Sequence, residues 1–211
     1  ANGAGSANTN GSTNSTVSIN DTAGFSIVSY VGNSTNSTVG HGLSTAPKMI
    51  IFKNTNDTAS WRVAHDSIGW NKSLFLDNTN ATQTEPTYFN STAPTNQVFY
   101  LGTNGGANNS GDNIIAYCFA EKTGYSKFGS YTGNGSTDGT FCYTGMKPSF
   151  VMLKKTSGTG NWQLFDNKRA GYNPDNDVLR PNLSNVECTS CVEIDMLSNG
   201  FKLKNTDGDG N

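Results

Sequence analysis

Short apolar runs separated by Gly, Asn, Ser and Thr follow one another along the whole chain. The runs are rich in Val, Ile, Phe and Tyr, which favours β-strands. No window carries the i, i+3, i+4, i+7 apolar spacing of an amphipathic helix. About seven short strands per half, joined by Gly, Asn and Pro turns, are typical of an all-β sandwich or jelly roll. The expected strands cover residues 17–19, 25–31, 38–43, 49–53, 61–65, 73–76, 98–101, 114–120, 126–131, 140–143, 150–154, 162–165, 177–179, 192–196 and 201–203.

The chain uses one sequence pattern twice. Each copy has a tyrosine, then a proline before an apolar run, then a tryptophan that opens a second run. Members of each pair of landmarks lie 101 residues apart. A repeat at this interval predicts a tandem duplication of one module of about a hundred residues. The paired positions also favour a packing role for both tryptophans. The landmark pairs are Tyr30 and Tyr131, Pro47 and Pro148, and Trp61 and Trp162.

The duplication divides the chain into two jelly-roll-like β-sandwich modules, at residues 21–122 and 123–211. Residues 1–20 are predicted to form a polar linker or arm because their first sixteen positions carry almost no apolar side chain. The second module lacks a counterpart of the apolar run at 114–120. A sandwich without its last strand exposes an unpaired edge. We therefore expect that the chain continues past Asn211 or, as the less favoured alternative, that a neighbouring subunit supplies the strand.

Composition narrows the classes of partner. Charged residues make up 14% of the chain, well below the norm of roughly 25%, and Asn, Ser, Thr and Gly replace them. The net charge of −2 argues against a nucleic-acid partner, which usually requires a basic patch. No apolar run approaches the ~18 residues of a membrane span, so no membrane insertion is expected. A polar surface with few charges is typical of extracellular and virion β-proteins.

The sequence gives little support to an enzyme. None of the motifs GxSxG, HExxH, GxGxxG or the P-loop occurs, and His41 and His65 lack a recognisable nucleophile nearby in sequence. Paired acids for glycan hydrolysis would have to come from residues without a flanking signature, such as Asp66, Glu85 and Asp166. A glycan-active enzyme is therefore the least favoured alternative.

The four cysteines allow three disulfide pairings. Cys188 and Cys191 have CxxC spacing, but no second CxxC or His pair completes a zinc site. A loop disulfide or two free thiols is favoured there over metal or redox chemistry. Cys118 and Cys142 each lie in an apolar run and are expected to be small buried hydrophobic residues.

One stretch resembles the start of a calcium loop. Asp207, Asp209 and Asn211 alternate with glycines and space their oxygen atoms as such a loop does. The distal Glu is missing, and the counterpart at residues 104–112 is poor in carboxylates. A polar turn is favoured, calcium is the alternative, and no other cofactor is expected.

Three aromatic residues are candidates for ligand contact. Trp70, Tyr88 and Phe89 have no strict equivalents in the other module and lie in longer loops. Variable loops on a rigid scaffold often carry binding residues, and aromatic rings suit contacts with sugars. We expect these three, more than the repeated tryptophans, to contact a ligand.

Several stretches together resemble a recurrent module of tail-fibre or virion-surface proteins from marine tailed bacteriophages. They span nearly all of residues 20 to 205, and Cys188 and Cys191 depart from the usual pattern. That family uses tandem sandwiches resembling concanavalin A-like (laminin-G-like) domains and closes the second with an aromatic-rich strand. The matching stretches are residues 22–30, 38–43, 46–51, 116–120, 124–136 and 197–203.

The resemblance implies a virion-surface location and carries no catalytic residues. The expected function is a non-enzymatic phage structural protein, a segment of a tail fibre or surface appendage with host-glycan adhesion. Its partners would be other virion proteins, copies of itself and host-surface glycans. The alternative is a capsid decoration or cement protein of the same fold, whose polar arm lies across neighbouring subunits.

Overall fold

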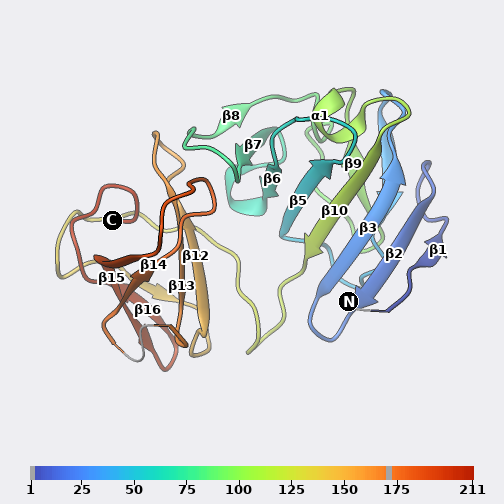
Figure 1. Ribbon diagram of the computed structural model, residues 1–211. Helices are drawn as coiled ribbons and strands as arrows, with labels where there is room; N and C mark the ends of the chain where they lie inside the picture. The colour runs from blue at the N-terminus through green and yellow to red at the C-terminus, as the bar shows by residue number, and fades with distance from the viewer. Residues whose placement is uncertain (1–2, 170–172) are drawn as a thin grey trace. The chain divides into compact units, whose positions relative to one another are not determined.

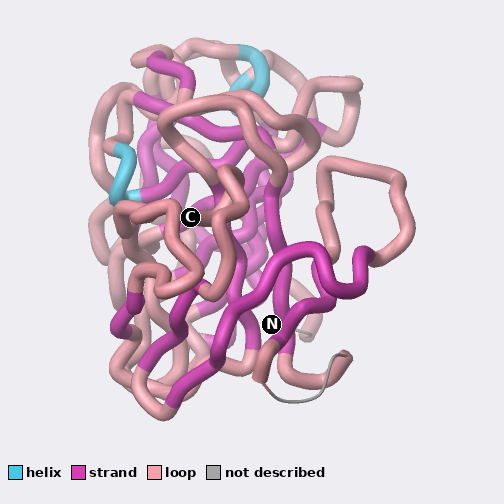
Figure 2. Tube along the Cα trace, turned by 90° about the vertical axis from the view of Figure 1, so that its left-hand side faces the viewer, coloured by secondary structure: helices cyan, strands magenta, loops and turns pink. Residues whose placement is uncertain are grey.

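A computed structural model describes residues 3–169 and 173–211. Nearly all regular structure is antiparallel β-sheet, as predicted, and the helical stretches are short (Figures 1 and 2). The chain divides into two compact units. Among the described residues, unit 1 comprises residues 3–75 and 82–129, and unit 2 comprises residues 76–81, 130–169 and 173–211. No helix in these described ranges is long and apolar enough to span a membrane.

Unit 1 is built on an eight-stranded sheet with the order β1-β2-β3-β10-β5-β6-β7-β8. A separate antiparallel pair, β4 with β9, contributes to the same core. The elements are β1 (Ser6–Asn8), β2 (Ser15–Asn20), β3 (Phe25–Val31), β4 (Ser37–Gly40), β5 (Met49–Asn54), β6 (Arg62–His65), the 3-10 helix η1 (Asp66–Ile68), β7 (Lys72–Phe75), β8 (Gln83–Thr84), β9 (Val98–Leu101), α1 (Gly105–Asn108) and β10 (Asn113–Phe119).

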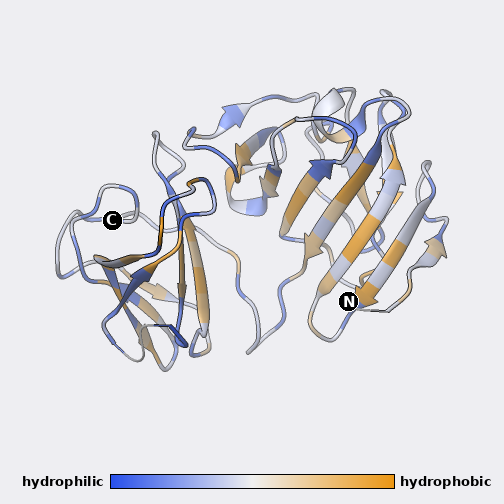
Figure 3. Cartoon of the chain, in the orientation of Figure 1, coloured by the Kyte–Doolittle hydropathy of each residue, from blue (hydrophilic) through white to orange (hydrophobic). Residues whose placement is uncertain are grey.

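The alternation of side chains along each strand explains the core of unit 1. Successive residues of a strand point to opposite faces of the sheet, and burial alternates along the central strands β3, β5 and β10, which carry many hydrophobic residues (Figure 3). Ile114, Ala116 and Cys118 of β10 are fully buried, whereas their neighbours in β10 are half-buried or exposed. The buried face packs against Phe99 of β9, whose ring lies 5.5 Å from that of Phe52 on β5.

Unit 2 has a four-stranded sheet with the order β11-β16-β15-β14 and a two-stranded ladder of β12 with β13. Its core is a separate hydrophobic cluster that includes Phe165, Ile194 and Leu203, all fully buried. A bridge between Leu164 and Leu179 joins the ladder to the end of β14. The strands are β11 (Phe141–Tyr143), β12 (Phe150–Lys154), β13 (Trp162–Asp166), β14 (Asp175–Val178), β15 (Cys188–Leu197) and β16 (Gly200–Leu203).

One set of hydrogen bonds occurs in both units, and we call it the Tyr–Asn clasp. In unit 1, Tyr30 Oη donates to the Ala107 carbonyl at 2.6 Å. The Asn108 side chain donates to the carbonyls of Thr35 and Gly102 at 2.8 and 2.7 Å. Its Oδ1 accepts from Asn33 N at 2.9 Å.

In unit 2, Tyr131 Oη donates to the Gly210 carbonyl. The Asn211 side chain donates to the carbonyls of Ser136 and Asn205 at 2.7 and 2.6 Å. Its Oδ1 accepts from Asn134 N at 2.9 Å. Tyr131 lies 101 residues after Tyr30, and Asn211 lies 103 residues after Asn108. Two different parts of the sequence therefore fold into the same local hydrogen-bond pattern, although the duplication itself stays a prediction.

Two sequence-based expectations differ from the structure. The described part of the predicted polar arm is not free, because β1 and β2 pair with each other and β2 pairs with β3. Most of the polar side chains of these two strands, at the edge of the sheet, are exposed or half-buried. The strand expected at residues 126–131 does not form. In unit 1 the equivalent strand, β3, pairs with β10, whereas no described strand lies in that position of unit 2.

The boundary between the units also differs from the predicted one at residues 122 and 123. Residues 123–129 belong to unit 1, and the short loop segment 76–81 belongs to unit 2. The aromatic residues of the 123–129 stretch account for the shift, since Phe128 packs on Phe119 and on His65 of unit 1.

A candidate aromatic binding groove

A shallow groove opens in unit 1 where β2 meets β3 and where β10 ends. Four of its nine lining residues are aromatic. Tyr125 is 64% exposed, so its ring is accessible to a ligand. The lining residues are Asn20, Ala23, Gly24, Phe25, Phe119, Ala120, Tyr125, Ser126 and Phe128.

Two tight turns place these side chains together. The β2–β3 turn closes through Gly24 N, which donates to the Asp21 carbonyl at 3.1 Å, and Gly24 has a φ of 65°. That left-handed conformation favours glycine. A Cβ at position 24 would also lie 2.5 Å from the Ala120 carbonyl oxygen. The close approach lets Ala120 N donate to the Gly24 carbonyl at 2.7 Å, which fixes the end of β10 beside the turn.

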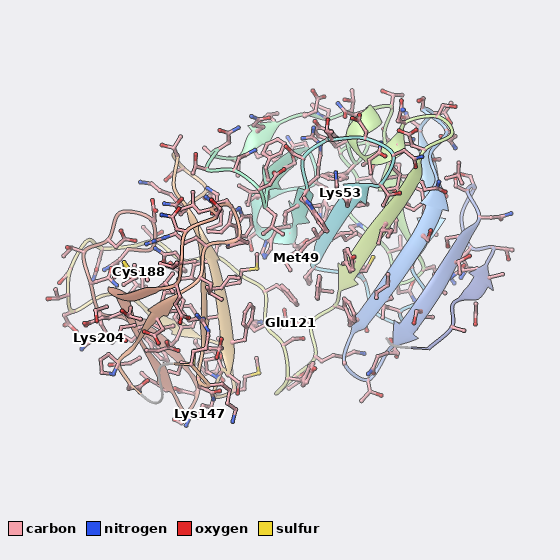
Figure 4. The ribbon with its side chains drawn as sticks, viewed as in Figure 1. Met49, Lys53, Glu121, Lys147, Cys188 and Lys204 are labelled. Carbon is pink, nitrogen blue, oxygen red and sulfur yellow. A yellow bond between two sulfur atoms is a disulfide. The ribbon has the colours of Figure 1, made fainter. Side chains whose placement is uncertain are left out.

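The second turn follows β10 directly. Ser126 N donates to the Lys122 carbonyl at 2.9 Å, and Ser126 Oγ donates to the Ala120 carbonyl at 3.2 Å. This turn positions Tyr125 and Phe128 beside the end of the strand. Glu121, just past β10, is visible in Figure 4.

The aromatic rings form a contiguous series. The rings of Phe25 and Phe119 lie 4.9 Å apart, and those of Phe119 and Phe128 lie 6.4 Å apart. Such contacts hold the floor of the groove rigid. An exposed phenol beside a rigid apolar floor can stack on the apolar face of a sugar while its hydroxyl bonds the sugar's polar edge.

The charges near the groove are paired. Lys127 Nζ lies 2.5 Å from Glu121 Oε1, and Lys122 Nζ lies 3.8 Å from Asp21 Oδ1. Hydrogen bonds from the Ser44 backbone and hydroxyl lower the pKa of the Asp21 carboxyl, which keeps that pair charged near neutral pH. The groove is therefore suited to a neutral polar ligand more than to an ion.

The structure buries the three aromatic residues that the sequence marked for ligand contact. Trp70, Tyr88 and Phe89 are 8%, 6% and 1% exposed. Phe89 stacks on Phe52 at 5.3 Å, and Trp70 Nε1 donates to Asp66 Oδ1 at 3.2 Å. These rings fill the core beneath their loops, so the structure does not present them to a ligand. The repeated tryptophans differ, since Trp162 is 4% exposed whereas Trp61 is half-buried and stacks on Tyr117.

The oxygen atoms of the suggested calcium loop are engaged in separate hydrogen bonds. Asp207 Oδ2 accepts from Gln163 Nε2 at 2.6 Å, Asp209 Oδ2 accepts from the backbone and side chain of Asn161, and Asn211 belongs to the clasp. Within residues 3–169 and 173–211, no group of three His, Cys, Asp or Glu side chains lies close enough to hold a metal ion. The geometry is that of a polar turn.

The cysteines and histidines have structural environments. Cys188 and Cys191 are joined by a disulfide at the start of β15 (Figure 4). Cys118 is buried and free, and burial raises the pKa of its thiol. His41 is fully buried and its Nε2 lies 3.1 Å from the Thr95 carbonyl. Burial lowers the pKa of His41, so the ring is held neutral as a hydrogen-bonding element of the core.

Sequence reasoning missed the groove because it assigned its residues to a repeat. The repeat predicts a strand at 126–131, whereas Phe128 lies in a loop beside the end of β10 together with Tyr125. A usable signal was present, since Phe25 follows Gly24 and Tyr125 follows Gly124. Both glycines adopt positive φ, and the aromatic residue after each of them lines the groove.

The fold and the groove define an all-β protein of two units with an aromatic surface site. The chain belongs to the family described as a domain of unknown function (DUF7483), which matches residues 1–211. No curated protein and no solved structure matches the chain.

Proposed function

We propose that the protein is a non-enzymatic structural component of the surface of a tailed-bacteriophage particle, in a fibre or appendage, and that the aromatic groove binds host-surface glycans. The exposed Tyr125 ring, in the groove that Phe25 and Phe119 also line, is the observation that carries the glycan part. The virion part rests on the resemblance of the sequence to phage surface modules. The low share of charged residues, 14%, suits a particle surface.

A test of the location is direct. Purified particles of the phage that encodes this chain are expected to contain it at many copies, detected by mass spectrometry and placed by antibody labelling on fibres. Its absence from purified particles would contradict the proposal. Labelling spread over the capsid shell would favour the decoration protein instead.

The arrangement of β1 and β2 weakens the argument for a capsid decoration protein. It required a free polar arm that reaches neighbouring subunits, whereas β1 and β2 are the first two strands of the unit 1 sheet. The fibre or appendage is therefore the function that we favour.

The glycan site gives a mutational prediction. Tyr125→Ala is expected to weaken binding to host polysaccharide by about tenfold, the effect of losing roughly 1.4 kcal/mol of ring stacking, and Tyr125→Phe is expected to retain most of it. Binding is measured on immobilised polysaccharide from host cells. The matched control is Tyr143→Ala, since Tyr143 is 68% exposed but lies on β11 of unit 2. Equal losses for both alanine variants, or no binding by the unmodified protein, would exclude the groove as the site.

A further inference from the structure

The β12–β13 ladder of unit 2 has the register of the β5–β6 ladder of unit 1. In unit 1, Met49 pairs with His65. In unit 2, Phe150 pairs with Asp166, and both members lie 101 residues further along the chain. The flanking bonds agree as well, because Asp66 N donates to the Lys48 carbonyl at 2.9 Å and Asn167 N donates to the Ser149 carbonyl at 3.1 Å.

The two ladders differ at the edge of β5 and of β12 that faces away from the hairpin partner. β5 also pairs along its length with β10, where Phe119 faces Met49 and Ile115 faces Lys53. Met49 at one end of that contact and Lys53 near the other are labelled in Figure 4. In the described part of the chain, β12 pairs with β13 alone. One edge of β12 therefore has no strand from the described residues beside it.

The alternation of an antiparallel ladder shows which backbone groups this edge presents. Hydrogen-bonded pairs occur at every second residue, and the Ser149–Asn167 bond fixes the phase. Val151 and Leu153 thus bond to β13. The N–H and C=O groups of Phe150, Met152 and Lys154 point the other way, to the unpaired edge. An exposed row of this kind is a template for a further strand.

The side chains of β12 have the same pattern as those of β5, which has a second strand paired beside it. Val151 and Leu153 are 6% exposed and belong to the unit 2 core, as Ile50 and Phe52 do in the unit 1 core. On the outer face, Phe150 is 57% exposed. Its counterpart Met49 faces an aromatic residue, Phe119.

We propose that the open edge of β12 binds an extended, antiparallel strand with the chemistry of β10. Such a strand carries small or aliphatic residues toward the core at the positions of Ile114, Ala116 and Cys118. It carries an aromatic residue opposite Phe150. Shifted by 101 residues, the register sets the position of Tyr117 opposite Met152 and that of Ile115 opposite Lys154. The Tyr–Asn clasp supports this occupant, because in unit 1 the same clasp is followed within five residues by β10.

The test uses the full chain and a synthetic peptide of residues 111–121 in which Cys118 is replaced by Ala. Amide hydrogen exchange of unit 2 is followed by NMR with and without the peptide. Exchange of the Met152 and Lys154 amides is expected to slow by about tenfold or more. The amides of Val151 and Leu153 should change little, since they already bond to β13.

A matched pair of peptides tests the geometry without any change in the protein. In unit 1, Thr55 N bonds to the Asn113 carbonyl and Gly32 N bonds to the Asp112 carbonyl. By alternation, the N–H of Tyr117 faces β5 and that of Ala116 faces β3. N-methylation of the peptide at Tyr117 should abolish the protection, and N-methylation at Ala116 should preserve it.

Each other outcome overturns the proposal. If no peptide slows exchange at Met152 and Lys154, the edge does not accept such a strand. If both N-methylated peptides act alike, the contact is not the proposed ladder. If the two amides are already protected in the chain alone, in proportion to protein concentration, the occupant is β12 of a second copy.

Discussion

Asn108→Ala is expected to destabilise unit 1 by about 2–4 kcal/mol, because it leaves the buried Gly102 carbonyl and the part-buried Thr35 carbonyl and Asn33 N–H without this partner, at up to about 1–3 kcal/mol each. The Asn108 side chain is fully buried and serves Thr35, Gly102 and Asn33 at once. Alanine can make none of these bonds. The free energy of unfolding is measured by urea titration, with amide exchange in β10 reporting on unit 1.

The neighbouring residue provides the control for this prediction. Asn109 is exposed, and its side chain donates a hydrogen bond to Asp112 Oδ2 at 2.7 Å. Asn109→Ala is therefore expected to cost less than about 1 kcal/mol. In unit 2, Asn211→Ala removes the same bonds from a half-buried side chain, so the loss there should be smaller. A similar effect of Asn108→Ala and Asn109→Ala would show that the clasp does not stabilise the fold.

Much of the fold could be predicted because its strands are short apolar runs bounded by turn residues. The runs at 98–101 and 150–154 coincide with β9 and β12, where composition and flanking polar residues agree. β1 and β2 were less visible, since a strand at the sheet edge contains mostly Ser, Asn and Thr. The failure at 126–131 has a different cause. A strand requires a partner as well as suitable residues, and the sequence of that segment does not show that its partner is missing.

The site was harder to predict than the fold because exposure depends on tertiary packing. Phe89 and Tyr125 both follow loop-like sequence, yet the first is 1% and the second 64% exposed. The difference comes from what each loop covers. Residues around Phe89 close over the unit 1 core, whereas the turn at 122–126 lies at the end of β10, beyond the buried face of the sheet.

The environment of Asp175 in unit 2 could not be inferred from the sequence. Asp175 is 1% exposed, and within residues 3–169 and 173–211 neither of its carboxylate oxygens has a partner at ordinary hydrogen-bond distance, although the nearby Asp177 backbone N–H lowers its pKa a little. Arg169 is near enough to lower its pKa, but that guanidinium bonds instead to Asp166 at 2.6 Å and to Glu187. Burial therefore dominates and raises the pKa of Asp175 from 3.8 to about 6, with further contributions from the charges of Asp166 and Asp177.

This raised pKa sets the sign of the pH dependence. The folded state holds the proton more tightly than the unfolded chain does, so the stabilising contribution of protonated Asp175 is complete below pH 3.8. It is lost as the pH rises through about 6. Asp175→Asn keeps the shape and removes the charge. We expect the difference between the unfolding free energies of the variant and the unmodified protein to be constant near pH 3.5. The difference should then grow in favour of the variant as the pH rises.

At neutral pH the divergence should reach about 2–3 kcal/mol in favour of Asp175→Asn, since each unit of pKa shift corresponds to about 1.36 kcal/mol. The measurement is the difference between the two unfolding free energies from pH 3.5 to 8. Taking the difference removes the opposite slope of carboxyls with lowered pKa, such as Asp166, because both proteins contain them. Asp57→Asn is the control, since Asp57 is exposed. A difference curve that is flat across pH 4 to 7 would mean that Asp175 ionises in the folded state at no cost.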